Sequence, residues 1–338
     1  MSESQNAPSG PPYIPTGVAL VGGRPTVSLD IPICAVFLTI YVLGAIGNMT
    51  IFQINRKRGH KFFMSWAMFG FCMARNATFV LRIVWATRPT NASVVIASMI
   101  FSAAGVLVAY IVMLLLSLRL FRATHPELGW SPKLRMACKG LYITLFVAFV
   151  LTISFTIESF YTLDANIKKV ALWVQRSSAL IMLLFNIASL IILCLSVFIP
   201  RTSAPENFGT GSIKRKTIIL SIMMFFVLFI IGFRFGTVWA DAPLASSPAW
   251  WDSKPAFYVI EFGLEIVVIY TLLLIRFDRI FWVPNGSAKA GDYRMLSDVA
   301  QEEEQLEEGE ELDERLPSSG GESILRLKEK KDNVEDEA

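Results

Sequence analysis

Five charged side chains lie inside long apolar segments of this chain, where charge is costly. Arg75 and Arg82 are seven residues apart and Glu261 and Glu265 are four apart, so each pair leaves one face of a helix. Arg234 lies in a third segment. A charged side chain at the centre of a bilayer costs ~2.5–3.5 kcal/mol even on the most lenient scale. We therefore expect these residues to pair with one another around a polar interior.

Seven apolar segments carry or flank these residues, and each has at least the ~20 residues that a helix needs to cross a bilayer. Hydrophobic residues make up 54% of the 338 and charged residues only 17%, which excludes a nucleic-acid-binding protein and an ordinary soluble enzyme. The predicted fold class is all-α, a polytopic membrane protein with seven transmembrane helices. The predicted transmembrane domain, 31–276, has its spans at 31–54, 62–86, 93–118, 140–160, 174–199, 217–240 and 255–276.

Positive charge predicts the orientation of these spans. On one side, the segments 55–61, 119–139, 200–216 and 277–294 carry 4, 5, 4 and 3 Lys/Arg, which makes 16. The positive-inside rule therefore places the N-terminus outside and the C-terminus in the cytosol. The segments on the other side carry 1, 1, 2 and 1, which makes 5; they are 1–30, 87–92, 161–173 and 241–254. Tryptophans mark the outer boundary, as an aromatic belt requires: Trp85, Trp173, Trp239, Trp250 and Trp251.

Depth indicates which interior charges can meet. At ~1.5 Å per residue, Arg82 lies ~6 Å and Arg75 ~16 Å below the outer end of the second span, while Glu261 and Glu265 lie ~9 Å and ~15 Å deep in the seventh. Arg234 lies ~9 Å deep in the sixth span. These depths predict a pair of Arg75 with Glu265, and either Arg82 or Arg234 near Glu261.

Three interpretations of the interior charges stay open at this point. They are ion pairs that only hold the helices together, a cavity whose charges orient a small polar or amphipathic ligand, or a path for protons or ions. Asn76, beside Arg75, joins the candidate residues. The candidates for ligand binding or interior ion pairs are Arg75, Asn76, Arg82, Arg234, Glu261 and Glu265.

Several other chemistries lack the residues they need. The predicted seventh span, 255–276, contains no lysine for a retinal Schiff base, and the only two histidines, His60 and His125, lie far from the interior carboxylates. A multi-histidine zinc site is therefore not expected, and neither a Gly-rich phosphate loop nor a Ser-His-Asp set is present. We expect no enzymatic activity, no metal and no cofactor.

The side predicted to be cytosolic offers a second set of candidates. The segment 119–139 is basic, and Pro126 and Pro132 stiffen it. It can hold anionic lipid headgroups or an acidic signalling protein, although plain positive-inside anchoring explains the same charges. Both ends of the chain, 1–30 outside and 277–338 in the cytosol, are predicted to be mostly disordered; the second contains nine acidic residues within 301–314. The candidate partner-binding residues are Arg119, Arg122, His125, Lys133 and Arg135.

The run GNMTIFQINRKRGHKFFMSWAMFGFCMARNATFVLRIVWA and the later motif HPELGW resemble a fungal-specific domain-of-unknown-function family of seven-helix membrane proteins. The likeness covers roughly 31–285 and includes Arg75, Asn76, Arg82 and the motif around His125. Some members of that family are named family-C-like G-protein-coupled receptors, from their helix count and topology. The family supplies no established catalytic or binding residues.

The resemblance implies a receptor-like protein, but the chain departs from true receptors. The third span ends Ser117-Leu118-Arg119-Leu120, without the acidic-Arg-aromatic triplet of rhodopsin-like receptors, and the seventh lacks Asn-Pro-x-x-Tyr. We predict a G-protein-coupled-receptor-like protein that senses a small polar or amphipathic ligand. The alternative is a lipid or small-molecule transporter of seven-helix form. The expected partners are the lipid bilayer, a small-molecule ligand and a cytosolic signalling protein, with no nucleic acid. The expected location is the plasma membrane, with an endosomal or vacuolar membrane as alternatives.

Overall fold

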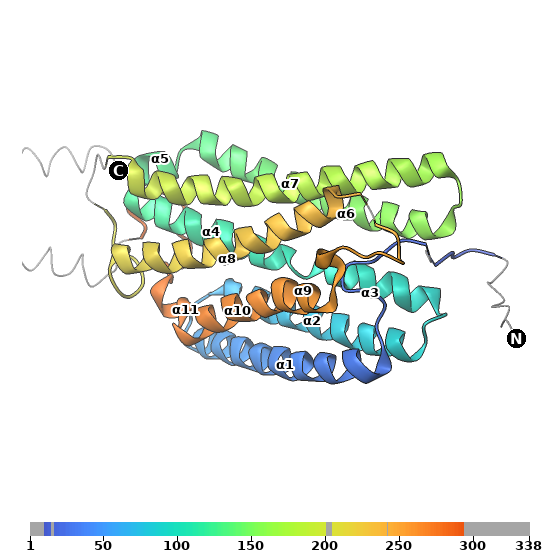
Figure 1. The fold of residues 1–338 in the computed structure, drawn as a ribbon. Helices are drawn as coiled ribbons and strands as arrows, with labels where there is room; N and C mark the ends of the chain where they lie inside the picture. Colours follow the sequence, from blue (N-terminus) through green and yellow to red (C-terminus); the bar gives the residue numbers. More distant parts are fainter. Residues whose placement is uncertain (1–9, 15–16, 201–204, 242, 294–338) are drawn as a thin grey trace, which may run out of the picture. The chain divides into compact units, whose positions relative to one another are not determined.

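Seven helices of this chain are long and apolar enough to cross a membrane. The computed structural model describes residues 10–14, 17–200, 205–241 and 243–293, and within these ranges the fold is all-helical apart from one isolated β-bridge between Val18 and Leu244. The prediction of an all-α bundle with seven membrane-length helices is confirmed (Figure 1). The first, second, fourth, fifth and sixth spans are α1 (Val27–Lys57), α2 (Phe63–Thr87), α6 (Pro132–Tyr161), α7 (Ala165–Phe198) and α8 (Ile213–Trp239).

The third and seventh spans are each built from more than one helical piece. The third consists of α3 (Ala92–Ala104) and α4 (Leu107–Thr124), with a turn at Gly105 and Val106 between them. The seventh begins with α9 (Lys254–Ala256), continues as the π-helix η2 (Phe257–Gly263) and ends as α10 (Leu264–Leu274). The short helices outside the spans are α5 (Pro126–Gly129), η1 (Trp250–Asp252) and α11 (Phe277–Ile280).

Two helices begin well before the predicted apolar segments, and a polar side chain caps the N-terminus of each. The side chain of Ser131 accepts a hydrogen bond from the Leu134 amide, so α6 begins eight residues before the predicted span. Asp164 caps α7 in the same way. The basic segment 119–139 is therefore not a loop. It consists of the end of α4, the short α5 and the first turns of α6.

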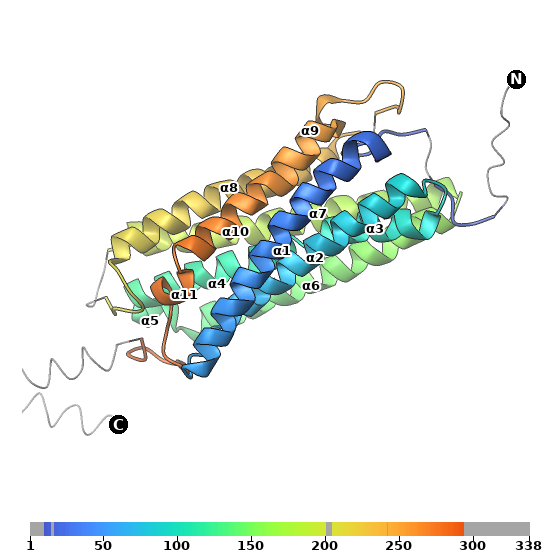
Figure 2. The ribbon, with the colours of Figure 1, turned by 90° about the horizontal axis from the view of Figure 1, so that it is seen from below.

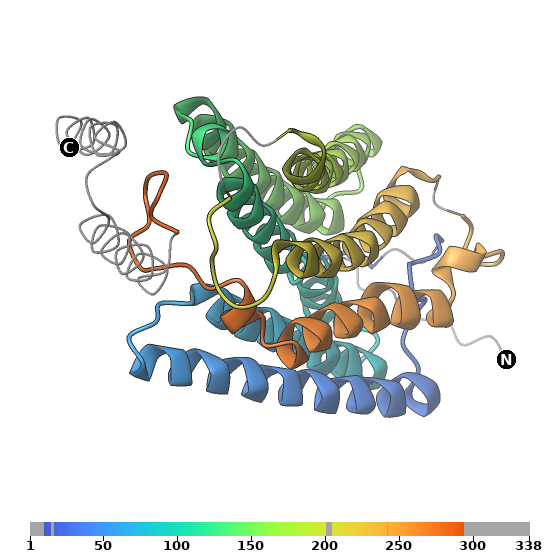
Figure 3. The ribbon, with the colours of Figure 1, turned by 90° about the vertical axis from the view of Figure 1, so that its left-hand side faces the viewer.

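The bundle is built around α4. Thirteen of its eighteen residues are buried, and it contacts α2, α7 and α8 (Figure 3). Around it, α1 packs on α2, α6 on α7 and α7 on α8. The seventh span closes the ring because α10 lies between α1 and α8 (Figure 2). The second, sixth and seventh spans, which are α2, α8 and the helix from α9 to α10, thus lie close enough for their charges to meet.

The chain before α1 packs on the end of the bundle at which α1 begins. The connection between α8 and α9 lies at the same end. The amide of Ala19 donates to the Pro243 carbonyl and the amide of Ala245 to the Gly17 carbonyl. Gly22 has φ 77°, and a Cβ there would lie 2.4 Å from the Phe257 ring, so only glycine fits. The prediction of a disordered segment over 1–30 is therefore wrong for residues 17–30, while 1–9 and 15–16 lie outside the described residues.

Residues 275–293 pack on the opposite end of the bundle, although the sequence predicted a mostly disordered tail from 277. Phe277, Phe281 and Tyr293 are buried, and these aromatic rings supply the apolar area that holds the segment. The acidic stretch 301–314 lies outside the described residues.

Candidate functional site

The deepest ion pair joins the second and seventh spans. Nε of Arg75 donates to Oε2 of Glu265 at 2.6 Å and Nη2 donates to Oε1 at 2.5 Å, a two-point contact in which both side chains are at most 1% exposed. The hydroxyl of Tyr41 donates to the same carboxylate at 3.2 Å. The rings of Phe71 and Phe262 lie 5.4 and 5.0 Å from the guanidinium carbon. The pair expected from matched depth is present and fully removed from solvent.

A second pair lies beside it. Nη2 of Arg234 contacts Oε2 of Glu261 at 3.0 Å, and Nη1 donates to the Ser102 carbonyl at 3.3 Å. Arg75 donates to the same carbonyl at 2.8 Å, so both guanidinium groups meet at the end of α3. Glu261 belongs to the π-helix η2. π-Helical turns inside α-helices are frequent at functional sites.

Two buried polar atoms next to these pairs have no hydrogen-bond partner within the described residues. They are Nε of Arg234 and the hydroxyl of Tyr110, whose side chain is fully buried. Tyr110 and Glu265 also line a cavity of about 10 Å³.

Arg82 does not meet Glu261; it belongs to a separate cluster nearer the N-terminal end of the bundle. Its Nη2 contacts Oδ1 of Asp30 at 3.1 Å and donates to the Gly22 carbonyl at 2.6 Å. The hydroxyl of Tyr258 donates to the same carboxylate oxygen at 2.7 Å, and Nζ of Lys254 contacts Oδ2 at 2.5 Å. Arg82 lies seven residues, or ~10.5 Å, from Arg75 along α2, whereas Glu261 lies only four residues, or ~6 Å, from Glu265 along the seventh span. Arg82 therefore lies beyond the level of Glu261 and contacts Asp30 instead.

Asp30 is the central residue of this cluster, and the sequence prediction missed it. The carboxylate is completely buried and also accepts from the amide and hydroxyl of Thr26. The prediction assigned it to a disordered segment because the apolar run begins one residue later. Two signals were available: an acidic residue four positions after a threonine at a helix start, and the i, i+4 spacing of Lys254 and Tyr258 on one helical face.

The two clusters together carry an excess of positive charge. The inner cluster consists of the pairs Arg75–Glu265 and Arg234–Glu261. The outer cluster has two cations, Arg82 and Lys254, and the single carboxylate of Asp30. Lys254 lies at its edge, with 20% of its side chain exposed. Lys254 is therefore the cation of this cluster that an anionic group can reach from the surface. The cations are Arg75, Arg82, Arg234 and Lys254, and the carboxylates are Asp30, Glu261 and Glu265.

Asn76 is not part of either cluster. Its amide nitrogen lies 4.0 Å from the Met73 sulfur, and its side-chain oxygen has no partner within the described part of the chain.

The candidates at the opposite end of the bundle divide into two groups. Arg119 donates to the Phe281 carbonyl at 2.6 Å, Arg122 donates to the Gly129 carbonyl at 3.3 Å, and His125 lies 3.1 Å from the Ile199 carbonyl. These three side chains hold the bundle and its neighbouring segments together. Lys133 and Arg135 are exposed and can meet a partner, although Arg135 also donates to the Ala288 carbonyl at 3.3 Å.

Glu206 and Tyr293 form an anchor at this end that the sequence did not indicate. The buried carboxylate of Glu206 accepts from the amides of Gly291 at 2.7 Å and Tyr293 at 3.1 Å. The Tyr293 ring packs against Trp130 and Phe208, with centroid separations of 5.5 and 5.8 Å. Burial raises the pKa of the Tyr293 phenol. The anchor holds residues 291–293 against α5 and the segment before α8.

Comparison with known proteins adds no family to this geometry: no family model matches the chain, and no curated protein or solved structure matches it. All four cysteines are free. Among the described residues, no group of three or more His, Cys, Asp or Glu side chains is arranged to hold a metal ion.

Proposed function

We propose that this protein is receptor-like, with a small anionic or amphipathic ligand bound near the outer cluster of Arg82, Asp30 and Lys254. The observation that carries the proposal is the excess positive charge of the buried network, whose edge at Lys254 reaches the surface. We also propose the topology in which this end faces outward, a plasma-membrane location, and membership of the fungal seven-helix family that residues 31–285 resemble.

A ligand at this position acts by competing for existing contacts. A carboxylate or phosphate that binds Lys254 and Arg82 weakens their ion pairs with Asp30. The pair of Asp30 with Lys254 joins α1 to the seventh span. The inner pairs, Arg75 with Glu265 and Arg234 with Glu261, connect that span to α2 and α8. A ligand shifts the helix arrangement only by its difference in affinity for the two states. The network offers such a difference because it reaches α1, α2, α8 and the seventh span.

Transport of a lipid or small molecule is the second candidate, and a specific observation favours it. The third span breaks at Gly105 and Val106, and the seventh is π-helical over Phe257–Gly263. Both irregularities lie beside the inner ion pairs. Secondary transporters place their binding sites at interrupted helices near the bilayer midplane.

One experiment separates the two functions. In cells that lack the endogenous protein, we would express variants at matched surface level and measure cyclic AMP and calcium for signalling, and fluorescent phospholipid flux for transport. The double variant Lys133→Gln with Arg135→Gln removes the exposed charges expected to face a cytosolic partner. Arg122 is left intact because its guanidinium packs 4.4 Å from the Trp130 ring. The matched control, Lys57→Gln with Arg58→Gln, removes two exposed charges from the same end of the bundle.

A receptor loses signalling in the Lys133/Arg135 variant, keeps it in the control and shows no lipid flux. A transporter keeps its flux in both and loses it in Glu261→Gln, which removes the carboxylate that faces Arg234. If no variant changes either readout, the buried charges only stabilise the bundle, and both functions are rejected.

A further inference from the structure

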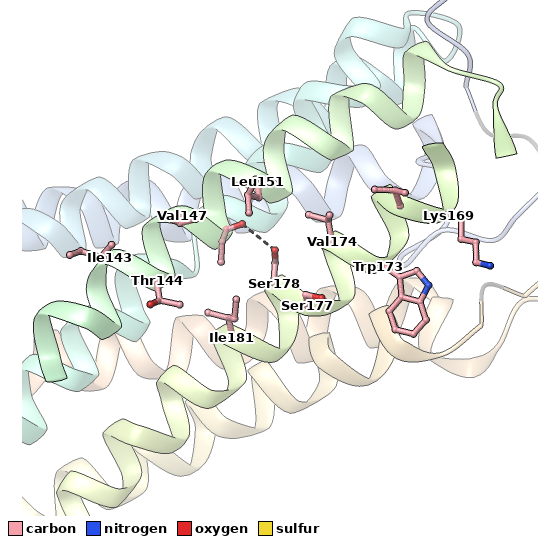
Figure 4. A pocket seen from close by; sticks show the side chains of 12 residues that line it. Ile143, Thr144, Val147, Leu151, Lys169, Trp173, Val174, Ser177, Ser178 and Ile181 are labelled. Atoms are coloured by element: carbon pink, nitrogen blue, oxygen red, sulfur yellow. Dashed lines mark hydrogen bonds between the residues drawn. The ribbon is translucent and has the colours of Figure 1, made fainter. Parts of the chain in front are cut away.

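A groove of about 570 Å³ runs along the surface between α6 and α7, away from the buried charges (Figure 4). Its walls are apolar, with Ile143, Val147 and Leu151 on α6 and Val174 and Ile181 on α7. Small side chains keep the groove open along its floor. There the hydroxyl of Ser178 donates to the Ala148 carbonyl at 3.2 Å, which ties the two helices together.

The groove spans the depth of one membrane leaflet. Trp173 and Trp239 are two of the tryptophans that the sequence predicts at the outer bilayer boundary, and their ring centroids are 6.3 Å apart. From Trp173 to Ile181 is eight residues, or ~12 Å, against ~15 Å for half of the hydrocarbon core. Lys169 is four residues nearer the aqueous end, ~6 Å above Trp173 and at the level of the headgroups.

The charge of Lys169, at the aqueous end of the groove, indicates which kind of lipid headgroup fits there. Lys169 is the only charged residue among those that line it, it is exposed, and it forms no ion pair within the described part of the chain. Its neighbour Lys168 is also exposed but does not line the groove. A cation at headgroup level above an apolar channel complements an anionic headgroup above a hydrocarbon chain.

We propose that the groove binds an anionic phospholipid of the surrounding leaflet, with one acyl chain between α6 and α7 and the headgroup phosphate at Lys169. The length of the groove matches a chain that ends near the bilayer midplane, and its walls are apolar as an acyl chain requires. This lipid site is independent of the receptor and transporter proposals.

The test uses the full chain in nanodiscs of equimolar phosphatidylglycerol and phosphatidylcholine, followed by mild detergent release and native mass spectrometry of the retained lipid. The wild type should retain phosphatidylglycerol in preference to phosphatidylcholine. Lys169→Gln should lower that preference about fivefold, which corresponds to ~1 kcal/mol for one cation near a lipid surface. Lys168→Gln is the matched control and should leave the preference unchanged.

A second variant tests the acyl chain. Ser177 is exposed and lines the groove, so Ser177→Phe fills it without disturbing the core and should reduce retention of both lipids. A phosphatidylglycerol with a photoreactive acyl chain should crosslink to residues 143–151 and 170–181 of the wild type. Equal effects of Lys169→Gln and Lys168→Gln, or crosslinks located on other helices, would overturn the proposal.

Discussion

The contacts of Arg75 explain how a full charge is tolerated deep in the bundle. Its guanidinium uses Nε and Nη2 on the Glu265 carboxylate and Nη1 on the Ser102 carbonyl, while two aromatic rings cover its faces. A lysine lacks both the planar fork and the second point of contact. The charge is therefore neutralised and its donors are satisfied at the cost of an interrupted third span.

We predict that the two side chains of this pair depend on each other. Arg75→Met or Glu265→Gln alone leaves one buried charge unpaired and should lower the stability by ~3–5 kcal/mol. The double variant Arg75→Met with Glu265→Gln should cost much less than the sum of the two single changes. Thermal unfolding in detergent, analysed as a double-mutant cycle, measures the coupling. Additive losses would contradict the pairing.

A second prediction concerns Asp30. Asp30→Asn should strongly destabilise the bundle, because Arg82 and Lys254 lose the only carboxylate that either contacts within the described residues. Asp241→Asn is the control: it also removes a carboxylate from a contact with an arginine, Arg176, but the Asp241 side chain is fully exposed. Unfolding temperatures of the two variants should differ clearly. Equal values would show that the outer cluster contributes no more than a surface pair.

Residue-level prediction from sequence succeeded where the helical rise alone determined the outcome. The depths of Arg75, Glu265, Arg234 and Glu261 were estimated by counting along regular α-helices, and both pairs are present although Glu261 lies in the π-helix η2. Depth could not choose between Arg82 and Arg234 as the partner of Glu261. It also could not indicate Asp30, because that choice depends on where α1 begins and on a chain segment that folds over the bundle.

Asp278 lies at the end of the bundle opposite the outer cluster, and we predict that its contacts contribute less to stability at acid pH. Burial raises the pKa of its carboxyl, but hydrogen bonds from Arg276 and Asn55 outweigh burial and hold the pKa below its usual value. A carboxyl with a lowered folded-state pKa stabilises the fold above its unfolded pKa of ~3.9, and this contribution disappears as the pH falls through the folded value.

The wild type should therefore exceed Asp278→Asn in stability by a constant amount between about pH 5 and pH 8, and the difference should shrink below about pH 4. Unfolding temperatures of both proteins across this range provide the measurement. A difference that grows towards acid pH would mean that the Asp278 pKa is raised instead.

At the scale of the helix, the break in the third span is the clearest departure from the sequence prediction. A Cβ at Gly105 would lie 2.9 Å from the guanidinium carbon of Arg75, so the arginine occupies the space beside the glycine. The segment 93–118 is mostly apolar and rich in small residues, and nothing in its pattern indicates this contact. The break depends on a side chain from another helix, which local pattern does not contain.

We predict opposite effects for two glycine-to-alanine changes. Gly105→Ala should displace Arg75 and weaken its contact with Ser102, which lowers the stability. Gly232, on an exposed face of α8, has nothing within 4 Å of an added Cβ, so Gly232→Ala should be neutral or stabilise the helix by up to ~1 kcal/mol. Thermal unfolding in detergent compares the two variants. If Gly105→Ala is as stable as Gly232→Ala, the arginine can move without cost.

A run of apolar residues in the sequence locates a membrane-spanning helix but does not locate the residues at which the helix begins and ends. Hydropathy marks the part of a helix that lies in hydrocarbon, whereas the backbone stays helical until a cap or a proline stops it. The predicted span 174–199 begins nine residues after the N-terminus of α7, where Asp164 provides the cap. The number and order of the spans were predictable because each needs only a long apolar run.

At the scale of the whole molecule, both ends of the bundle are covered by segments that looked like tails in the sequence. Residues 17–26 reach the outer cluster through the Gly22 carbonyl, and residues 277–293 are held by Glu206 and buried aromatic rings. Composition alone did not indicate this packing, because a few carbonyls and rings suffice to anchor a polar segment. The ends most relevant to function were therefore the least predictable part of the fold.

The orientation of the bundle is the remaining prediction, and every functional proposal depends on it. The 16-to-5 division of Lys and Arg places the loop 240–253 outside and residues 277–293 in the cytosol. Ser247 and Ala290 are both exposed and lie at opposite ends, so cysteines at these positions report on the two sides. In intact cells, Ser247→Cys should react with an impermeant maleimide and Ala290→Cys should react only after permeabilisation. The wild type measures background from the four native cysteines, of which three are buried. The reverse pattern would place Lys254 and its cluster on the cytosolic side, where the proposed ligand would have to be an intracellular anion.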